Sequence, residues 1–441
     1  MVVQWDLSTA AAALHNGHTT AEALLELHLQ KITLHERHLN CFITMDEVGA
    51  RDQAKASQSR HLAGTPLSKI DGIPIALKDN IDVAGVPTSN GTVKFSQAPH
   101  DSAVANQLRA AGAVLVGKLN MDECALGGTT DNPHHGVTHN PWRHGYTPGG
   151  SSGGSGAAVA AGMVVAALGT DTLGSVRLPA AYCGIVGVKP TQGLINMAGI
   201  SPLSPSLDQV GPLCRCVEDC ATMLSIMVGE EMHEGVQPMD KALQFGVLTP
   251  IEDNNCETDV LAGFEKTRSD LAKINGDTIQ VTLPEIDFPT LRKASLLFIE
   301  AEAWIALSGQ VVARPDAYSE TFKNMLAYGR DVDPRKKTVA KKMLKTLGDK
   351  IRCLFDKIDI LVLPAAPQLA FAFADPIPSN QIDFTALASL SGCPSIVLPT
   401  GLSSSGLPLS AQLMAAPYKD HQLLSVAAEL ECRWGRLDPP V

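Results

Sequence analysis

The stretch GGSSGGSGAAVAAGMVVAALGTDTLGSVRLPAAYCGIVGVKP, residues 149–190, decides the fold. A glycine-serine loop leads into an alanine-rich helical run, which is followed by an apolar, strand-like run at 163–168 and a polar turn at 169–175. Ser151 and Ser175 lie in the two glycine-flanked turns. Because glycine lets other groups approach the backbone closely, these serines are candidates for a nucleophile and its proton relay.

A flexible linker is the alternative interpretation of residues 149–156, because glycine and serine dominate them. The run that follows, AAVAAGMVVAAL, is apolar and has no linker character. This neighbour favours a turn held on buried structure over a linker.

The composition is that of a globular enzyme. The chain has 441 residues, which suits one large α/β domain, and 45% of them are hydrophobic while 18% are charged. These values exclude a disordered protein. The net charge of -11 argues against a nucleic-acid partner, and the one basic cluster, residues 335–345, is typical of a solvated helix face.

The ten cysteines are scattered, and neither paired CxxC units nor CxxC with HxxxH occur. We therefore expect no metal site. The first residues lack a basic segment followed by an apolar core, and no later window reaches ~18 uninterrupted apolar residues. These patterns predict a cytoplasmic protein with no membrane segment.

The spacing of apolar residues predicts helices that alternate with strands along the chain. Predicted helices lie at 19–34, 47–62, 103–111, 260–274, 290–307 and 339–355, and predicted strands at 72–77, 114–116, 245–248, 278–281, 360–363, 395–398 and 411–414. Thr19 and Glu22 match a capping box at the start of the first helix. The alternation indicates an α/β fold with a single large mixed β-sheet sandwiched between layers of α-helices.

Lys78 stands where an apolar strand meets a polar loop, after GIPIAL and before Asp79 and Asn80. A lysine desolvated at such a strand end can lose its proton and act as a base. The alternative is a lysine that simply leaves the core for solvent.

These residues coincide with a family pattern. The segments GGSSGGSGAAVAAG and GTDTLGSVRLPAAYCGIVGVKPT, with DGIPIALKDNID around Lys78 and IDILVLPAAP near the C-terminus, resemble the amidase signature family of serine hydrolases. The likeness is dense at 72–227. It implies a single amidase domain over 1–441, made of an N-terminal helical arm at 1–65, the signature core at 72–227, a variable and mostly helical substrate-side region at 228–350, and a C-terminal return to the sheet at 358–441.

The resemblance implies a Ser-Ser-Lys triad, in which Ser175 is the nucleophile, Ser151 the bridging serine after a cis peptide bond, and Lys78 the base. It also implies an oxyanion hole made by backbone N–H groups around Thr172, Leu173, Gly174 and Ser175, and substrate contacts at Gly128 and Thr129. No metal or organic cofactor is implied.

The chemistry of these side chains supports the same roles. A serine hydroxyl donates and accepts at once, so Ser151 can take the proton of Ser175 while passing its own to Lys78. Lys78 must be neutral for this step. Lowering its pKa from ~10.4 toward ~7 requires desolvation and, we expect, positive neighbours.

Leu173 departs from the family pattern, because many relatives read TDTGGS where this chain has TDTLGS. A leucine at positive φ would be strained by roughly 1–2 kcal/mol. We therefore predict a negative φ at Leu173, and a side chain that narrows the pocket entrance.

Two local patterns suggest other chemistry. The segment GGSSG also fits the nucleophile elbow of α/β-hydrolases, with a distant Asp and His421 as partners. The preceding RHGYTP is turn-like, however, where the elbow needs a strand. His134, His135 and His139 have unsuitable flanks for a metal site, and we expect a polar loop beside the pocket.

The resemblance leaves two functions open. The main one is a stand-alone amidase that cleaves the C–N bond of a small carboxamide, or of a urea-like or carbamate-like compound, and releases ammonia or an amine. The alternative is the glutamine-hydrolysing A subunit of a tRNA-dependent amidotransferase. A bidentate arginine would suit a substrate carboxylate, but a rough alignment places Leu344 at the expected position, with Asp383 as the matching acidic residue. We expect a small-molecule amide partner, no nucleic acid or membrane, and a homodimer.

Overall fold

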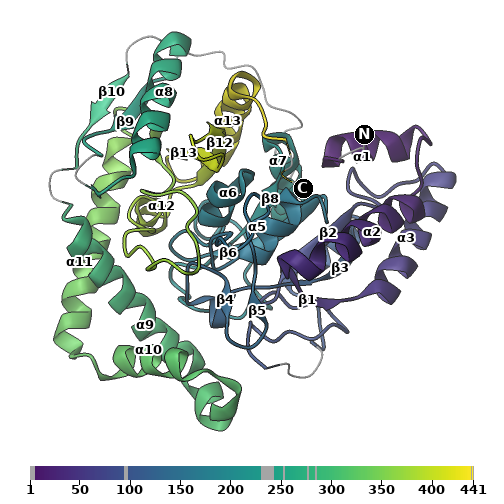
Figure 1. Cartoon of the computed structure of the whole chain (residues 1–441), viewed down its shortest axis with the longest axis horizontal. Coiled ribbons are helices and arrows are strands. Elements are labelled where there is room, and N and C mark those ends of the chain that lie inside the picture. The colour runs from purple at the N-terminus through teal and green to yellow at the C-terminus, as the bar shows by residue number, and fades with distance from the viewer. Residues whose placement is uncertain are drawn as a thin grey trace.

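The computed structural model describes residues 5–93, 98–229, 243–251, 254–275, 278–283, 286–438 and 440. Their strands form one eleven-stranded mixed sheet in the order β1-β3-β2-β6-β8-β7-β12-β13-β11-β9-β10. The sheet runs through the body of the molecule with helices packed along it (Figure 1). The predicted fold class is confirmed.

The strands of the sheet are β1 (Phe42–Met45), β2 (Pro74–Lys78), β3 (Val114–Leu119), β6 (Ala166–Asp171), β7 (Val186–Lys189), β8 (Gln209–Cys214), β9 (Phe245–Leu248), β10 (Ile279–Val281), β11 (Ile360–Pro364), β12 (Ser395–Leu402) and β13 (Pro408–Ala415). A separate hairpin pairs β4 (Asp131–Asn132) with β5 (Gly136–Val137).

The α-helices are α1 (Leu7–His15), α2 (Ala21–Leu39), α3 (Glu47–Leu62), α4 (Ala103–Ala110), α5 (Gly153–Ala160), α6 (Arg177–Cys183), α7 (Val217–Val228), α8 (Thr258–Asn275), α9 (Phe288–Ala313), α10 (Glu320–Asp331), α11 (Pro334–Leu354), α12 (Thr385–Ser391) and α13 (Asp420–Trp434). Two 3-10 turns lie at η1 (Glu123–Ala125) and η3 (Pro315–Ala317).

The central strands are buried on both faces. Every residue of β2, β3, β6 and β8 is buried, which explains why these strands read as continuous apolar runs rather than alternating ones. α5 and α6 pack together and contact β6 and β7, while α7 and α13 pack together and contact β8 and β12. This central block combines elements from the predicted signature core with β12 and α13 from the C-terminal segment.

The two ends of Figure 1 hold the less central helices. α1, α2 and α3 form the arm at the right, and α9, α10 and α11 form a helical extension at the lower left (Figure 1). The first predicted helix begins at Ala21, two residues after the predicted start at 19, and its capping side chain is Thr20, whose hydroxyl accepts from the Ala23 N–H, and not Thr19.

α9 passes a length and composition test for a membrane-spanning helix, and it is the one helix in the described part of the chain that does so. The test is weak for a single helix, and α9 packs against α10 and α11. The cellular location of the protein stays a prediction.

Candidate active site

The sheet brings Lys78 to the turn that carries the second serine. β2 and β6 are parallel neighbours, with Leu77 opposite Leu168, so their carboxyl ends meet at the same edge. Lys78 ends β2, and Ser175 lies in the turn that follows β6. Ser151 lies just before α5, the helix that packs on both strands.

A side-chain hydrogen bond joins Lys78 to Ser151, and a backbone hydrogen bond joins the turns that carry the two serines. The Lys78 amine donates to Ser151 Oγ at 2.7 Å and to Thr170 Oγ1 at 2.9 Å. The peptide bond between Gly150 and Ser151 is cis, as predicted. The next N–H, of Ser152, donates to the Ser175 carbonyl at 3.2 Å and so holds the two serine turns together. The predicted triad residues therefore lie in one place.

Burial sets the protonation state of Lys78. The side chain is fully buried, and desolvation lowers its pKa to about 7. Asp122, Asp171 and Asp208 oppose this shift. The expectation of positive neighbours was therefore wrong: the surrounding charges are carboxylates, and desolvation alone outweighs them.

The turn from Thr172 to Ser175 has N–H groups without a described partner, and its backbone packs closely against Thr385. Of the N–H groups of Leu173, Gly174 and Ser175, none donates to another group in the part of the chain that the structure describes. Gly174 has φ +146°, and a Cβ there would meet Thr385 Oγ1 at 2.5 Å. Leu173 is not among the described non-glycine residues with positive φ, so the prediction of a negative φ is confirmed.

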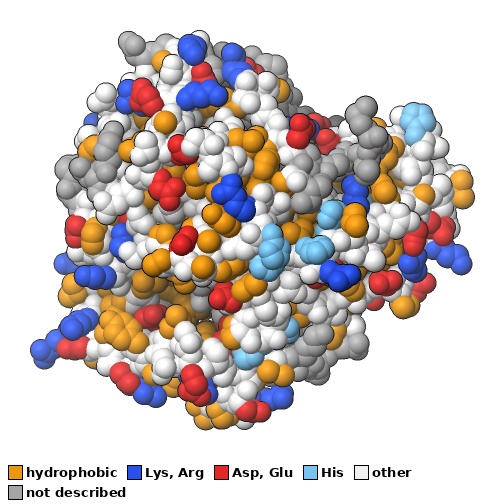
Figure 2. Space-filling model, viewed as in Figure 1, with side chains coloured by type: hydrophobic (Ala, Val, Ile, Leu, Met, Phe, Trp, Pro, Cys, Tyr) orange, Lys and Arg blue, Asp and Glu red, His pale blue; other side chains and the backbone are white. Residues whose placement is uncertain are grey.

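A cavity of about 290 Å³ opens onto this turn. Its wall includes the whole predicted oxyanion segment, with Ser175 9% exposed. Gly128 lines the cavity as well, whereas Thr129 is buried behind it and its N–H donates to Asp122 Oδ2 at 3.2 Å. The apolar lining residues are Ala125, Leu126, Leu173, Leu178, Leu203, Leu296, Ile299, Met325, Ile377, Pro378 and Ile382. On the face drawn in Figure 2, hydrophobic side chains line a hollow beside the helical extension.

Two charged residues of α9 also line the cavity, and sequence reasoning missed both. Arg292 donates through Nε and Nη2 to the two oxygens of Asp383, at 2.9 and 2.8 Å, and through Nη1 to Ser379 at 3.2 Å. Glu300 lies two turns further along the helix. An arginine therefore does line the same cavity as Ser175, paired with the predicted Asp383. It comes from α9, while Leu344 is a buried residue of α11 outside the cavity lining.

The other candidate features lie away from this cavity. His134 pairs with Glu123 at 2.9 Å, and neither it nor His135 nor His139 is among the residues lining the cavity. No group of metal-binding side chains occurs in the described ranges. The loop before Ser151 contains no strand, as the argument against the α/β-hydrolase elbow requires.

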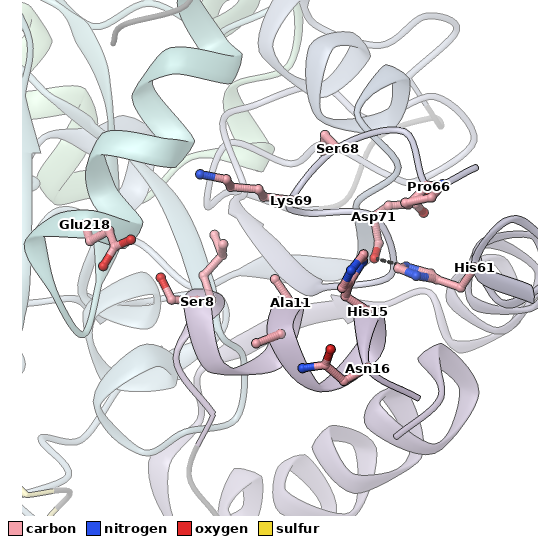
Figure 3. A pocket seen from close by; sticks show the side chains of 12 residues that line it. Ser8, Ala11, His15, Asn16, His61, Pro66, Ser68, Lys69, Asp71 and Glu218 are labelled. Carbon is pink, nitrogen blue, oxygen red and sulfur yellow. Dashed lines mark hydrogen bonds between the residues drawn. The ribbon is translucent and has the colours of Figure 1, made fainter. Parts of the chain in front are cut away.

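A second cavity of about 440 Å³ lies between α1, the loop before β2 and the start of α7 (Figure 3). His61 and Asp71 meet in it through a contact of 3.0 Å between His61 Nε2 and the Asp71 carbonyl (Figure 3). It shares no lining residue with the Ser175 cavity, and the Asp71 carboxylate is already held by Arg60 at 2.6 and 2.8 Å.

Residues 23–424 match the family described as Amidase. The chain belongs to the amidase family. It is therefore a hydrolase of the class that acts on carbon–nitrogen bonds.

Relatives and solved structures span nearly the whole chain. The A subunit of glutamyl-tRNA(Gln) amidotransferase from Anaeromyxobacter dehalogenans (strain 2CP-C) is 34% identical, over 98% of this chain and 97% of the relative. The same-named protein of Chloroflexus aurantiacus (strain ATCC 29366 / DSM 635 / J-10-fl) is also 34% identical, over 95% and 94%. A crystal structure titled as an amidase superposes with TM-score 0.90 at 31% identity, covering 98% of this chain and all of the other. The native peptide amidase of Stenotrophomonas maltophilia has TM-score 0.84 at 25% identity, over 99% and 98%.

Proposed function

We propose that this amidase-family protein hydrolyses a carboxamide through an acyl-enzyme on Ser175. The observation that carries the proposal is the buried hydrogen bond from Lys78 to Ser151, made by an amine whose pKa burial lowers to about 7. Such a lysine is neutral in a substantial fraction of molecules near neutral pH, and a neutral amine can accept a proton.

The proton relay runs from Ser175 through Ser151 to Lys78. Ser175 Oγ attacks the amide carbonyl while its proton moves to Ser151, and Ser151 passes its own proton to Lys78. The C–N bond then breaks as the proton returns by the same route to the leaving nitrogen. Water attacks the resulting ester under the same base, which releases the carboxylic acid and restores Ser175.

The turn at Leu173 to Ser175 stabilises the oxyanion in this scheme. Its N–H groups have no partner among the described residues, and the turn lines the cavity, where the negative charge of the tetrahedral intermediate would develop. Loss of one such donor typically costs ~10² to 10³ in rate.

A second candidate is the glutamine-hydrolysing A subunit of an amidotransferase, and the relatives' names favour it over a stand-alone amidase. One feature of the cavity also supports it. Arg292 and Asp383 offer the two charges that would bind the carboxylate and the ammonium group of an amino acid. Binding would require both to leave their present ion pair, and the α9 residues that line the cavity between Arg292 and Glu300 are apolar, so the geometry favours the first candidate.

The deciding experiment is hydrolysis by the purified single chain of aliphatic amides, aryl amides, anilides, urea derivatives and glutamine. Turnover of an amide by the wild type that disappears in Ser175→Ala and Lys78→Ala supports the proposal. Cleavage of glutamine alone, and only with added partner subunits, would replace it with the second candidate.

Arg292→Leu separates the two candidates on the same panel. If glutamine is the substrate, this variant lowers the ratio of glutamine to aliphatic amide turnover by about 10²-fold or more, because a charge-assisted pair is lost. Lys293→Leu, an exposed neighbour on α9, is the matched control. An unchanged ratio contradicts the second candidate.

A further inference from the structure

α9 presents two different charge environments to the Ser175 cavity. Arg292 and Glu300 are eight residues apart, which corresponds to about 12 Å along the helix axis. Leu296 and Ile299 lie between them and line the same cavity. A substrate that reaches from Ser175 along α9 therefore meets an apolar wall with a charge near each end.

The two charges differ in how they are compensated. Arg292 is held by both oxygens of Asp383 and by Ser379, and its side chain is 17% exposed. Within the described residues, the Glu300 carboxylate has no hydrogen bond and no ion pair. When ionised, Glu300 is therefore a charge without a partner among the described residues of this wall.

Glu300 also lacks the structural task that another carboxylate of α9 performs. Glu302 accepts hydrogen bonds from the hydroxyls of Ser204 and Ser206, at 2.6 and 2.8 Å, and so ties α9 to the loop that carries Leu203. Glu300 ties α9 to nothing comparable among the described residues. Its carboxylate is half-buried in the cavity wall, and desolvation raises its pKa to about 7. A cation placed beside it would restore the ionised form.

We propose that Glu300 selects amide substrates that carry a cationic group, an ammonium or a guanidinium, at the end of an apolar chain. The inference rests on the proposed hydrolysis at Ser175 and names the substrate class of that site. The apolar chain packs along Leu296, Ile299 and Met325, and the cation forms a charge-assisted hydrogen bond with Glu300. Glu300 is a specificity-determining residue in this scheme and takes no part in the proton relay.

The first test measures binding without turnover. Ser175→Ala protein is titrated by calorimetry with n-alkylammonium ions, with n-alcohols of matched length and with n-alkyl carboxylates. We expect the ammonium series to bind about tenfold to a hundredfold more tightly than the alcohols. Adding Glu300→Gln removes this preference, while Glu320→Gln, an exposed carboxylate of α10, leaves it intact. Equal binding of ammonium and alcohol, or a preference that survives Glu300→Gln, overturns the proposal.

The second test measures turnover by the wild-type chain. A short series of ω-amino amides, and N-(ω-aminoalkyl) amides with the cation on the leaving group, is compared with methyl-terminated isosteres. We expect kcat/KM to favour a cationic member about tenfold or more, and Glu300→Gln to bring that ratio close to one. A ratio near one for both series in the wild type overturns the substrate class.

The two tests separate the two proposals. If no amide is cleaved but ammonium binding depends on Glu300, the hydrolysis proposal fails and the cation site stands. If neutral amides are cleaved through Ser175 and ammonium binding is indifferent to Glu300, the cation site fails alone.

Discussion

Two of the regions that line the Ser175 cavity differ in character. On the core side, the turn from Thr172 to Ser175 lines the cavity, while Lys78 and Ser151 are fully buried, connected by a hydrogen bond and outside the lining. The helical extension contributes Arg292 and Glu300, whose side chains are partly exposed and come from a single helix. The core side is a closed network, whereas the extension side is a set of separate contacts.

This difference assigns chemistry and selectivity to different parts of the chain. In a buried hydrogen-bond network, replacing one residue leaves its partner without a hydrogen bond or without its proton donor or acceptor, so every single replacement should reduce activity. A partly exposed side chain on a helix can change without disturbing its neighbours, so the extension can alter substrate choice while the core keeps the reaction. Core variants should therefore affect all substrates alike, and extension variants should change ratios between substrates.

The largest expected effect is the loss of the nucleophile. Ser175→Ala should lower kcat for every amide that the wild type cleaves by about 10⁴-fold to 10⁶-fold, because the acyl-enzyme cannot form. Steady-state assays on two chemically different amides measure this. A variant that keeps substantial turnover of either amide would mean that Ser175 is not the nucleophile.

The next effect concerns the connection between the core and the C-terminal elements. Arg177 is fully buried and donates to both Asp171 oxygens at 3.0 and 2.8 Å, to the Thr385 carbonyl at 2.6 Å and to Gln412 at 2.8 Å. Burial alone would raise the pKa of Asp171, but the Arg177 guanidinium outweighs it and the pKa is lowered. Arg177→Met leaves this carboxylate buried and unpaired, and should reduce the free energy of unfolding by about 3–5 kcal/mol in urea denaturation.

Arg292→Met is the matched control for that measurement. It breaks the pair with Asp383 in the extension wall, where water can reach the arginine. Arg292→Met should reduce the free energy of unfolding by less than half as much as Arg177→Met does. Equal losses for the two variants would contradict the distinction between a closed core and an open extension.

The pH profile tests the core network at a smaller scale. Proton acceptance requires neutral Lys78, so kcat/KM should fall about tenfold for each pH unit below about 7 and level off above it. The sign for stability follows from the same lowered pKa. The unfolded chain binds more protons than the folded one between the lowered pKa and the ordinary one, so this group makes folding more favourable as pH rises through that window.

Asp122→Asn provides the control for the pH profile. The Asp122 carboxylate raises the pKa of Lys78, so its neutralisation should move the midpoint of the activity profile to lower pH. Asparagine retains an oxygen that can accept from the Thr129 and Thr130 N–H groups, which the carboxylate now binds. A midpoint that stays in place or rises would show that Lys78 is not the titrating base.

The sequence predicted the core far better than the extension, and the reason is physical. Glycine-rich turns and apolar runs flank Lys78, Ser151 and Ser175. Such local patterns predict tight turns and buried strands directly from the sequence. Arg292 and Glu300 are separate charges in a long, mostly apolar helix, and nothing in the local sequence shows that α9 lines the cavity. The alignment pointed to Leu344 for the arginine because it followed sequence order, while the cavity receives its arginine from another helix.

The smallest effect is expected where the two regions touch. Leu173 is 4% exposed, belongs to the turn of the core, and packs in one cluster with Leu203 of the core and Ile299 of the extension. Leu173→Gly removes a side chain that lines the cavity together with Ser175, and so tests whether this side chain narrows the entrance. It should raise kcat/KM for a bulky aryl amide relative to a small aliphatic amide by a few-fold. Adding or removing a methylene or two in an apolar pocket changes substrate discrimination by a similar factor.

The backbone makes this substitution informative. Leu173 does not need positive φ, so glycine brings no relief of strain there, and a change in the ratio reports space alone. A smaller buried side chain can reduce the fraction of folded protein, but this loss lowers both rates equally. It therefore cancels in the ratio when both amides are measured on one preparation. If kcat/KM fell equally for both amides, their ratio would stay constant. Leu173 would then affect catalysis through the shape of the turn at 172–175 and would not select between substrates. A higher ratio in favour of the bulky amide would show that Leu173, although it lies in the turn that carries Ser175, also selects substrates by their size.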